Sequence, residues 1–522
     1  MIDFPAFEEK NFNIVNVNRK AVIYKLFDAE TEAFSKYCAL LLEKDYVLKE
    51  KRDSGVYLYS AFLNGEEGVF VNYFNKTKQL YIVAEQNCNY FNFSNVCSDP
   101  VTAPQITQLE QEDYGMSYVI RLSDGRFIVI DGGNNFEPDI DRLMNCLKAG
   151  SNSEKPVIAS WIFTHEHSDH YLGYIGFDNK YEGEYEVQSF ILNFMETDDE
   201  RFPGADSTDR RQEYNTSRRV NVPILFDKMK KSGAGVYMAH TGQVYNIGDA
   251  RLEFLSSLDE TVDYMKANIN CTSLVFKMLL GGQTILWTGD STFDEAKLTQ
   301  RYGEYLKSDI LQVPHHGFEG PSDPKAEVEG YAFTDAHTCM IPVSEFNAYT
   351  AIDTFRNGPR YLFEHSNAVE IITGDDNKTL TLPYQPDAYR RIEYKAKFRE
   401  GLTRNGATTW VFDNLFFENA EDITFNFLNM CNKNATVWVS IYFLDGSKNL
   451  GDIKIELSSG LKKINITDKE SIITDSVWFS WMTPDLKGFP ESGEFAVRFI
   501  SDIPIVISNK NQKPIYTNEI NV

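Results

Sequence analysis

The segment FTHEHSDHYLG, Phe163–Gly173, is the feature that most restricts the folds open to this chain. It places three of the chain's eight histidines and one aspartate within six residues, directly after the apolar run VIASWIF. Such a run is typical of a buried strand, and the DHYLGYIGF pattern after it indicates the start of a helix. The fold must therefore gather imidazoles and a carboxylate at the end of a strand.

The spacing within this segment predicts two adjacent metal ions. In an extended segment alternate side chains share a face, so His165 and His167 can converge on one point. Asp169 and His170 stand where the helix begins and can turn toward a neighbouring point. Imidazole and carboxylate are ligands used by zinc, manganese and iron, and two ligand pairs suit two ions better than one. The competing interpretation, a polar turn that happens to be rich in histidine, leaves the matching downstream residues unexplained.

Further downstream residues can reach the same point. The runs SLVFKMLL and QTILWTG are predicted strands joined by Gly281 and Gly282, so Asp290 follows the second strand at the open end of a hairpin. Its two carboxylate oxygens allow it to bridge two cations. The run DILQVP predicts another strand, which delivers His315 and His316 to the same end.

These motifs resemble those of the metallo-β-lactamase superfamily. THEHSDH matches its HxHxDH signature. NINCTSLVFKMLLGGQTILWTGDS and SDILQVPHHG are similar to later motifs of the metal-dependent domain of competence proteins and of choline-phosphate esterases. The resemblance covers roughly residues 106–387 and implies an α/β fold with a metallo-β-lactamase-like αββα sandwich core. It implies nothing about the flanking regions.

The resemblance also implies roles for single residues. Asp131 stands at the family's earlier aspartate and is expected to orient the ligands from behind. In similar enzymes the terminal ligand follows the strand and proline directly, which favours His315 as that ligand and leaves His316 to face the substrate and donate a proton to the leaving group. The expected metal ligands are His165, His167, Asp169, His170, Asp290 and His315, and the expected catalytic residues are Asp169, His316 and Asp131.

One position departs from the family pattern. The family supplies another histidine just before the first strand of the hairpin, where this chain has NINC, with Asn268 and Asn270. His240, in MAHTGQVYNIGD, is an alternative ligand, but it precedes a different pair of strands and is expected to be an ordinary histidine. We therefore expect a first metal site built from the HxH pair and Asp290, completed by Asn270 or by water. Such a site should bind more weakly than one with three imidazoles.

The expected activity is hydrolysis with a dinuclear metal site. Two divalent cations, zinc with manganese or iron as alternatives, would lower the pKa of a bound water and neutralise charge on the attacked centre. The TGDS and VPHHG forms favour a phosphodiester or another small phosphate ester. Two alternatives stay open: a lactamase-, lactonase- or thioesterase-like hydrolase, and a binding module with a degenerate metal site. An electron-transfer diiron role is disfavoured, because relatives with that chemistry generally carry an acid where His167 stands.

Charge and hydropathy restrict the partners. Acidic residues outnumber basic ones by 76 to 51, and the net charge of −25 repels bulk nucleic acid and acidic membranes. No stretch approaches the roughly 20 apolar residues of a membrane helix, and MIDFPAFEEK lacks the features of a signal peptide. The expected location is cytoplasmic. It would be extracellular only if a leader were missing from this sequence, in which case Cys88 and Cys97 could pair.

The pattern along the chain predicts three domains. Residues 1–100 combine one helix, with Asp28 as its N-cap, and three strand-like runs, an α+β unit expected to be a scaffold or docking module. Residues 106–387 form the catalytic domain. Residues 396–522 contain short alternating runs such as ATVWVSIYFLDG and predict an all-β sandwich, a candidate substrate- or partner-binding module.

Three other features are weaker candidates for the site. The arginines of DRRQEYNTSRRV either clamp an anionic group or line a solvated helix face, and the second interpretation is favoured. His337 has no motif around it and is expected to be structural. His365 is also expected to be structural, although it lies late enough in the predicted core to border the cleft.

Overall fold

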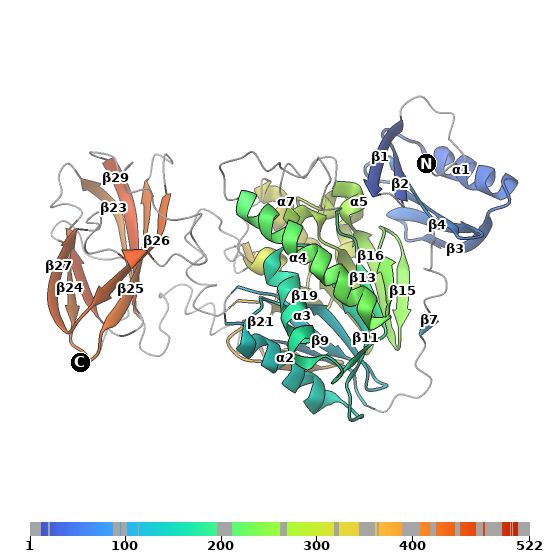
Figure 1. Cartoon of the computed structure of the whole chain (residues 1–522). Coiled ribbons are helices and arrows are strands. Elements are labelled where there is room, and N and C mark those ends of the chain that lie inside the picture. The colour runs from blue at the N-terminus through green and yellow to red at the C-terminus, as the bar shows by residue number, and fades with distance from the viewer. Residues whose placement is uncertain are drawn as a thin grey trace. The chain divides into compact units, whose positions relative to one another are not determined.

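Figure 1 shows the computed structural model of the chain, in which two compact units are distinguished. The first comprises Met1–Ala348 and Arg356–Ala388, and the second comprises Tyr349–Phe355 and Tyr389–Val522. The structure describes residues 12–18, 21–86, 94–95, 102–112, 114–195, 211–261, 269–317, 323–343, 361–362, 365–388, 408–417, 424–443, 449–465, 473–474, 493–501, 503 and 505–509.

An antiparallel sheet and one helix form the N-terminal part of the first unit. The strand order is β1–β2–β6–β5–β4–β3. Helix α1, Thr31–Glu43, packs Phe34, Tyr37 and Leu41 into the core beneath the sheet. The strands are β1 Phe12–Asn18, β2 Ala21–Leu26, β3 Val47–Asp53, β4 Tyr57–Asn64, β5 Glu67–Phe74 and β6 Gln79–Glu85.

The N-cap of α1 differs from the sequence-based prediction. The N-cap is Glu30, which makes no side-chain capping bond, so the prediction of Asp28 was wrong. Asp28 has a left-handed backbone, with φ of 53°. It therefore belongs to the turn before the helix, a conformation that aspartate adopts more readily than most residues.

The first core sheet carries the segment that precedes the histidine cluster. Its order is β14–β13–β11–β10–β9–β8–β22, with β12 paired to β11. Strands β10 and β11 pair in parallel and are buried, which explains their continuous apolar runs. The predicted hairpin around Asp124 and Gly125 is confirmed, since β9 and β10 pair antiparallel. The strands are β8 Gln105–Gln108, β9 Ser117–Arg121, β10 Phe127–Asp131, β11 Val157–Ile162, β12 Glu186–Val187, β13 Ser189–Leu192, β14 Gly235–Met238 and β22 Lys378–Thr381.

The second core sheet carries the downstream site residues. Its order is β21–β20–β19–β18–β17–β16–β15–β7. The predicted hairpin at Gly281 and Gly282 is confirmed by the antiparallel pairing of β17 with β18, and both glycines have positive φ, 57° and 78°. The strands are β7 Ser94–Asn95, β15 Val244–Ile247, β16 Ala250–Ser256, β17 Val275–Leu280, β18 Gln283–Trp287, β19 Ile310–Gln312, β20 Thr338–Met340 and β21 Glu370–Ile372.

Helices cover the outer faces of these two sheets (Figure 1). Leu143 of α2, Tyr174 of α3 and Leu225 of α4 share one buried core with the first sheet. Between the sheets, the rings of Tyr118 and Trp287 meet edge-on, with centroids 4.9 Å apart. The helices and 3-10 turns are α2 Glu137–Gly150, α3 Ser168–Tyr181, α4 Arg211–Ser232, α5 Leu258–Thr261, η2 Ile269–Thr272, α6 Leu298–Tyr302, η3 Gly303–Leu306, η4 Pro314–Gly317 and α7 Pro324–Thr334.

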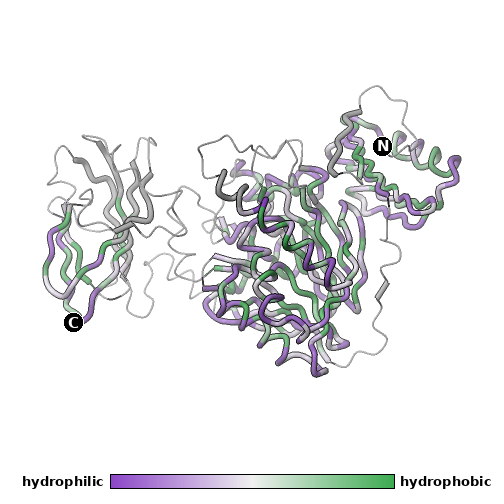
Figure 2. The backbone as a smooth tube through the Cα atoms, viewed as in Figure 1, coloured by the Kyte–Doolittle hydropathy of each residue, from purple (hydrophilic) through white to green (hydrophobic). Residues whose placement is uncertain are grey.

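The core is therefore a mixed α/β structure with several sheets, consistent with a metallo-β-lactamase-like fold. Hydrophobic residues follow its inner strands, and hydrophilic residues recur along its outer helices and loops (Figure 2). No helix among the described residues is long and apolar enough to cross a membrane.

The N-terminal sheet makes buried contacts with the core of the same unit. Lys25 Nζ donates to the carbonyl of Glu260 at 3.3 Å, and Asn72 Nδ2 donates to the carbonyl of Thr241 at 3.1 Å. The predicted boundary near residue 100 thus falls inside one compact unit.

The second unit contains two antiparallel sheets with a hydrophobic core of their own. Their orders are β23–β29–β25–β26–β28 and β27–β24–β30. Phe425, Val437 and Phe499 are among the fully buried residues. The strands are β23 Thr408–Phe417, β24 Thr424–Asn429, β25 Ala435–Phe443, β26 Asn449–Leu457, β27 Gly460–Asn465, β28 Ile473–Thr474, β29 Gly493–Ser501 and β30 Val506–Asn509.

Candidate metal centre

The histidine cluster lies between the end of β11 and the start of α3. His165 is fully buried, and its Nδ1 is 3.1 Å from Oγ1 of Thr164. His167 is the N-cap of α3, and Asp169 and His170 belong to the first turn of that helix. The ring of His165 lies 4.8 Å from that of His167 and 4.2 Å from that of His170, measured between centroids. This short segment thus gathers the side chains that the sequence predicts to converge.

Asp290 lies between the two halves of the cluster. It follows β18, and its Oδ2 is 3.7 Å from Nε2 of His165 and 3.2 Å from Nε2 of His170. Gly289, with φ of 55°, lets the backbone before Asp290 lie close to Thr164, because a Cβ atom at position 289 would lie 2.9 Å from Cβ of Thr164. One carboxylate therefore faces candidate ligands on both sides.

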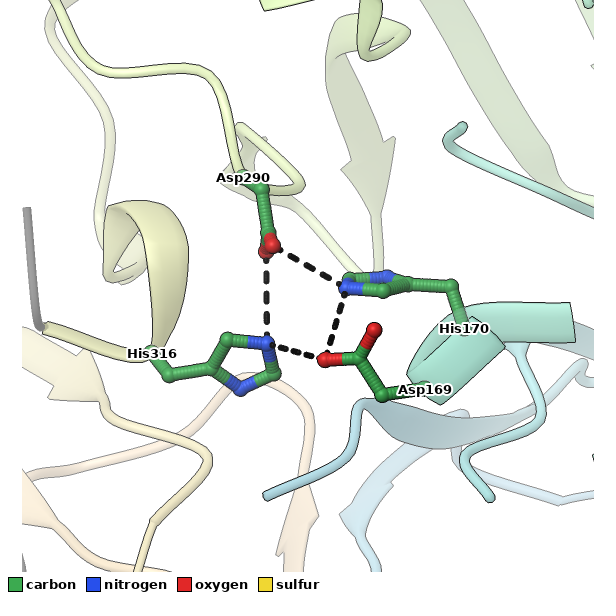
Figure 3. Close-up of side chains that lie close together, drawn as sticks. All are labelled: Asp169, His170, Asp290 and His316. Atoms are coloured by element: carbon green, nitrogen blue, oxygen red, sulfur yellow. Dashed lines mark ion pairs between the residues drawn. The ribbon is translucent and has the colours of Figure 1, made fainter. Parts of the chain in front are cut away.

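His315 and His316 lie in η4, after β19, and both have a left-handed backbone, with φ of 46° and 51°. Figure 3 shows His316 pointing into the group of Asp169, His170 and Asp290. Its Nε2 is 3.3 Å from Oδ2 of Asp169 and 3.5 Å from Oδ1 of Asp290. Nε2 of His315 is 3.8 Å from Oδ2 of Asp290. The sharp turn thus brings His316 into this group, where the sequence favoured His315.

The candidate ligands form two groups that share Asp290. Within each group the ligand atoms lie within 4.8 Å of one another. Nε2 of His165 is buried and has no hydrogen-bond partner among the described residues. Imidazole nitrogens and carboxylate oxygens are the donors that divalent transition metals use in proteins, so these residues fit divalent metal binding. The first group is His165, His167 and Asp290, and the second is Asp169, His170, Asp290 and His316.

Asn270 stands where the family pattern has a further histidine. It lies in η2 and is buried, and its Nδ2 is 3.0 Å from Nε2 of His315. It therefore contacts His315 at the edge of the cluster. The completion of the first group by Asn270 or by water stays a prediction.

Asp131 lies behind the cluster at the end of β10. It is fully buried in a left-handed conformation, with φ of 57°. Its Oδ1 accepts the backbone N–H of Thr164 at 2.7 Å, and its Oδ2 accepts the hydroxyl of Thr164 at 2.8 Å. Oδ2 also lies 2.8 Å from Nδ1 of His170. This arrangement leaves Nε2 of His170 directed toward Asp290, as an orienting role for Asp131 requires.

Burial and neighbouring charges shift the pKa values of the imidazoles. Burial by itself lowers the pKa of His170, but the carboxylates of Asp290 and Asp131 raise it well above its ordinary value. Burial and the nearby His170 hold the pKa of His165 well below its ordinary value. Burial lowers the pKa of His167 to about 4. His165 and His167 are therefore neutral near pH 7, which is the form that binds metal.

His240 is fully buried and belongs to neither group of candidate ligands. Its Nδ1 is 2.6 Å from Oδ2 of Asp259, and its Nε2 is 3.1 Å from Oε2 of Glu85. Burial by itself lowers its pKa, but these two carboxylates raise it to about 10. His240 thus joins the N-terminal sheet to the core through two carboxylates.

The arginine-rich segment contributes one buried side chain. Arg218 of α4 is 2% exposed, and its Nη2 is 3.2 Å from Oε1 of Glu166. The favoured interpretation of a solvated helix face is therefore wrong for Arg218, because Glu166 draws the guanidinium into the interior. Arg219 is exposed. Arg210 lies outside the described residues.

The remaining candidates lie apart from the cluster or cannot be placed. Nδ1 of His337 is 2.8 Å from Oγ1 of Thr338, and the side chain of His365 is exposed. Cys88, Cys97 and Asn268 lie outside the described residues.

Thr164 and Glu166 are buried residues of the cluster whose roles the sequence reasoning missed. The Thr164 hydroxyl links Oδ2 of Asp131 to Nδ1 of His165. Glu166 lies between two candidate ligands and pairs with an arginine distant in sequence. Both residues adjoin candidate ligand histidines at the end of an apolar strand, and this position is the sequence feature from which their roles could have been predicted.

Comparisons with known proteins give matches to solved structures at low identity and with low TM-scores. No family model matches the chain, and no curated protein matches it. The metallo-β-lactamase fold protein YhfI from Bacillus subtilis is 13% identical, with 53% of this chain and 99% of that chain covered and a TM-score of 0.33. A putative metal-dependent hydrolase from Parabacteroides distasonis is 11% identical, with coverages of 60% and 97% and a TM-score of 0.26. A HARLDQ motif mutant of a metallo-β-lactamase from Cronobacter sakazakii is 12% identical, with coverages of 57% and 96% and a TM-score of 0.24.

Proposed function

We propose that the chain is a metal-dependent hydrolase with a dinuclear centre. The observation that carries this proposal is the position of Asp290, whose Oδ2 lies 3.7 Å from Nε2 of His165 and 3.2 Å from Nε2 of His170. A carboxylate shared by two groups of donors suits two cations side by side. The group with His167 would hold one ion and the group with His316 the other. Zinc is the proposed metal, with manganese and iron as alternatives.

When bound, the two cations would lower the pKa of a water molecule and neutralise negative charge on the attacked centre. The chain's own residues orient the site: Asp131 holds Nδ1 of His170, and Thr164 holds Nδ1 of His165. We assign proton donation to the leaving group to the imidazole of His315. Its side chain is 15% exposed, and its Nε2 lies 3.8 Å from Asp290, so it can meet a substrate at the edge of the cluster.

The proposed substrate is a small phosphodiester or another phosphate ester. Two cations, when bound, would suit an anionic tetrahedral centre, because they would neutralise its negative charge. The net charge of −25 disfavours a long polyanion such as bulk DNA. The likeness of TGDS and VPHHG to motifs of phosphoesterase-type relatives supports the same class. A substrate- or partner-binding role for the second compact unit, and a cytoplasmic location, complete the proposal.

The test is a substrate screen on the full chain. Protein stripped of metal and reconstituted with zinc, manganese or iron is assayed on bis(4-nitrophenyl) phosphate, a phosphomonoester, a chromogenic cephalosporin, a lactone and a thioester. We expect phosphodiester turnover that a chelator abolishes and that Asp290→Asn lacks, whereas His365→Ala retains it. Efficient ring opening without phosphodiester turnover under any metal would overturn the substrate class. Metal binding without turnover of any substrate would favour the degenerate binding module.

A further inference from the structure

Glu166 is a buried acidic residue between two candidate metal ligands. It lies between His165 and His167, and it is 2% exposed. Its Oε1 accepts the backbone N–H of Met195 at 3.3 Å and Nε of Arg218 at 3.2 Å. The carboxylate is thus bound to the segment that follows β13 and to α4, while the two flanking imidazoles converge on Asp290.

Arg218 joins three segments that meet behind the cluster. Besides its bonds to Glu166, its Nη2 donates to the carbonyl oxygen of Met195. The guanidinium therefore contacts both the ligand turn and the chain that follows β13. Helix α4, which carries Arg218, also packs against α3, the helix that supplies Asp169 and His170.

A buried ion pair such as Glu166–Arg218 is in general a weak source of stability. A buried ion pair loses much of its Coulomb attraction to desolvation, and apolar residues of similar volume often stabilise a fold equally well. A guanidinium has a rigid, planar set of donors, so it fixes the orientation of the groups that it binds. Here those groups are the carboxylate of Glu166 and the carbonyl oxygen of Met195. Glu166 lies in the HxH turn, which belongs to the group with three candidate ligands rather than four.

We propose that Arg218 is a positioning residue for the first metal site, in which it holds Glu166 and thereby fixes His165 and His167 for one cation. This inference rests on the proposed metal centre. Residues behind ligands typically change metal affinity by about 10–100-fold when they are removed. The expected effect is selective, because Glu166 lies between His165 and His167 in the chain, whereas Asp169 and His170 belong to α3 and His316 belongs to η4.

The experiment is a two-step calorimetric titration of metal-free protein with Zn²⁺. The step that His167→Ala removes identifies the first site. We expect Arg218→Met to weaken that step by about 10–100-fold and to leave the other step unchanged. Arg219→Met is the matched control, since it removes an exposed arginine from the same helix. Arg218→Lys keeps the charge but not the fork of donors, so it should restore part of the affinity.

The outcomes separate this inference from the proposed function. Two results for Arg218→Met would overturn the positioning role and leave the metal centre standing. One is a first-site affinity equal to that of Arg219→Met, and the other is an equal loss of affinity at both steps. If Arg218→Met fails to fold, Arg218→Lys carries the same test: selective weakening of the first step supports the role, and unchanged affinity overturns it. An unmodified protein that binds no Zn²⁺ would overturn both proposals.

Discussion

Nδ1 of His170 lies 2.8 Å from Oδ2 of Asp131, and both side chains are fully buried. This contact fixes the ring, so that the opposite nitrogen, Nε2, faces Asp290 at 3.2 Å. A carboxylate bonded to the far nitrogen of a ligand histidine sets its tautomer and raises its basicity. The contact between β10 and the first turn of α3 therefore prepares one ligand of the proposed centre.

We predict that Asp131→Asn lowers zinc affinity at the second site by about 10–100-fold, because the amide is a weaker acceptor for His170. Competition with a chelating dye measures this. Asn tolerates the left-handed backbone at φ 57°, whereas alanine does not, so Asp131→Ala should also lose thermal stability. Unchanged affinity in Asp131→Asn would contradict the orienting role.

Asp290→Ala is expected to abolish tight metal binding at both sites, because both groups of donors share this carboxylate. Elemental analysis after reconstitution and desalting measures the metal content. His365→Ala is the control, since that histidine is exposed and belongs to neither group of candidate ligands. Loss of only one metal equivalent would show that Asp290 does not bridge.

The two histidines of η4 should separate binding from turnover. We predict that His316→Ala removes metal from the second site, because its Nε2 lies 3.3 Å from Asp169 and 3.5 Å from Asp290. His315→Ala should keep its metal and lose turnover, chiefly for substrates with poor leaving groups. Metal content and hydrolysis measured on the two variants decide between these assignments, and the reverse pattern would restore the sequence-based one.

His240 predicts a pH dependence of stability that is independent of metal. Its folded-state pKa of about 10 exceeds its ordinary value of 6.5, so its protonated form stabilises the folded protein. That contribution is complete below about pH 6.5 and is lost as the pH rises toward 10, at up to about 1.4 kcal/mol per pH unit. Urea unfolding across this range measures the free energy of unfolding.

The control for this prediction is His240→Gln, which cannot be protonated. Its free energy of unfolding should be lower near neutral pH and should fall less steeply between pH 7 and 9 than that of the unmodified protein. If the free energies of unfolding of the two proteins changed in parallel with pH, the prediction of a charged His240 between Glu85 and Asp259 would be contradicted.

Truncations should behave differently at the two ends. A chain ending near residue 395 is expected to stay folded and bind metal, because the second unit has its own buried core. A chain beginning near residue 100 is expected to aggregate, because it would expose aromatic surface that the N-terminal sheet covers. Tyr302, for example, packs edge-on against Tyr57 and Phe74 of that sheet. Circular dichroism and size-exclusion chromatography test both expectations.

The sequence by itself determined the strands that lead to the site and the clustering of its ligands. Apolar runs and glycine turns predicted the hairpins β9–β10 and β17–β18, because local backbone preferences and burial act within a few residues. The HxHxDH spacing predicted the convergence of His165, His167 and His170 for the same reason, since these residues are neighbours along the chain.

Only the tertiary structure decided which residues meet from distant segments. The turn in η4 places His316, rather than His315, in the group with Asp169 and Asp290. Two consecutive left-handed residues direct the second imidazole toward these carboxylates. Arg218 and Glu166 are 52 positions apart, and no periodic pattern in the sequence predicts that they pair. The bonds of His240 likewise reach across 155 residues to Glu85. Such contacts depend on how sheets and helices pack, and a buried charge finds its partner only after that packing has formed.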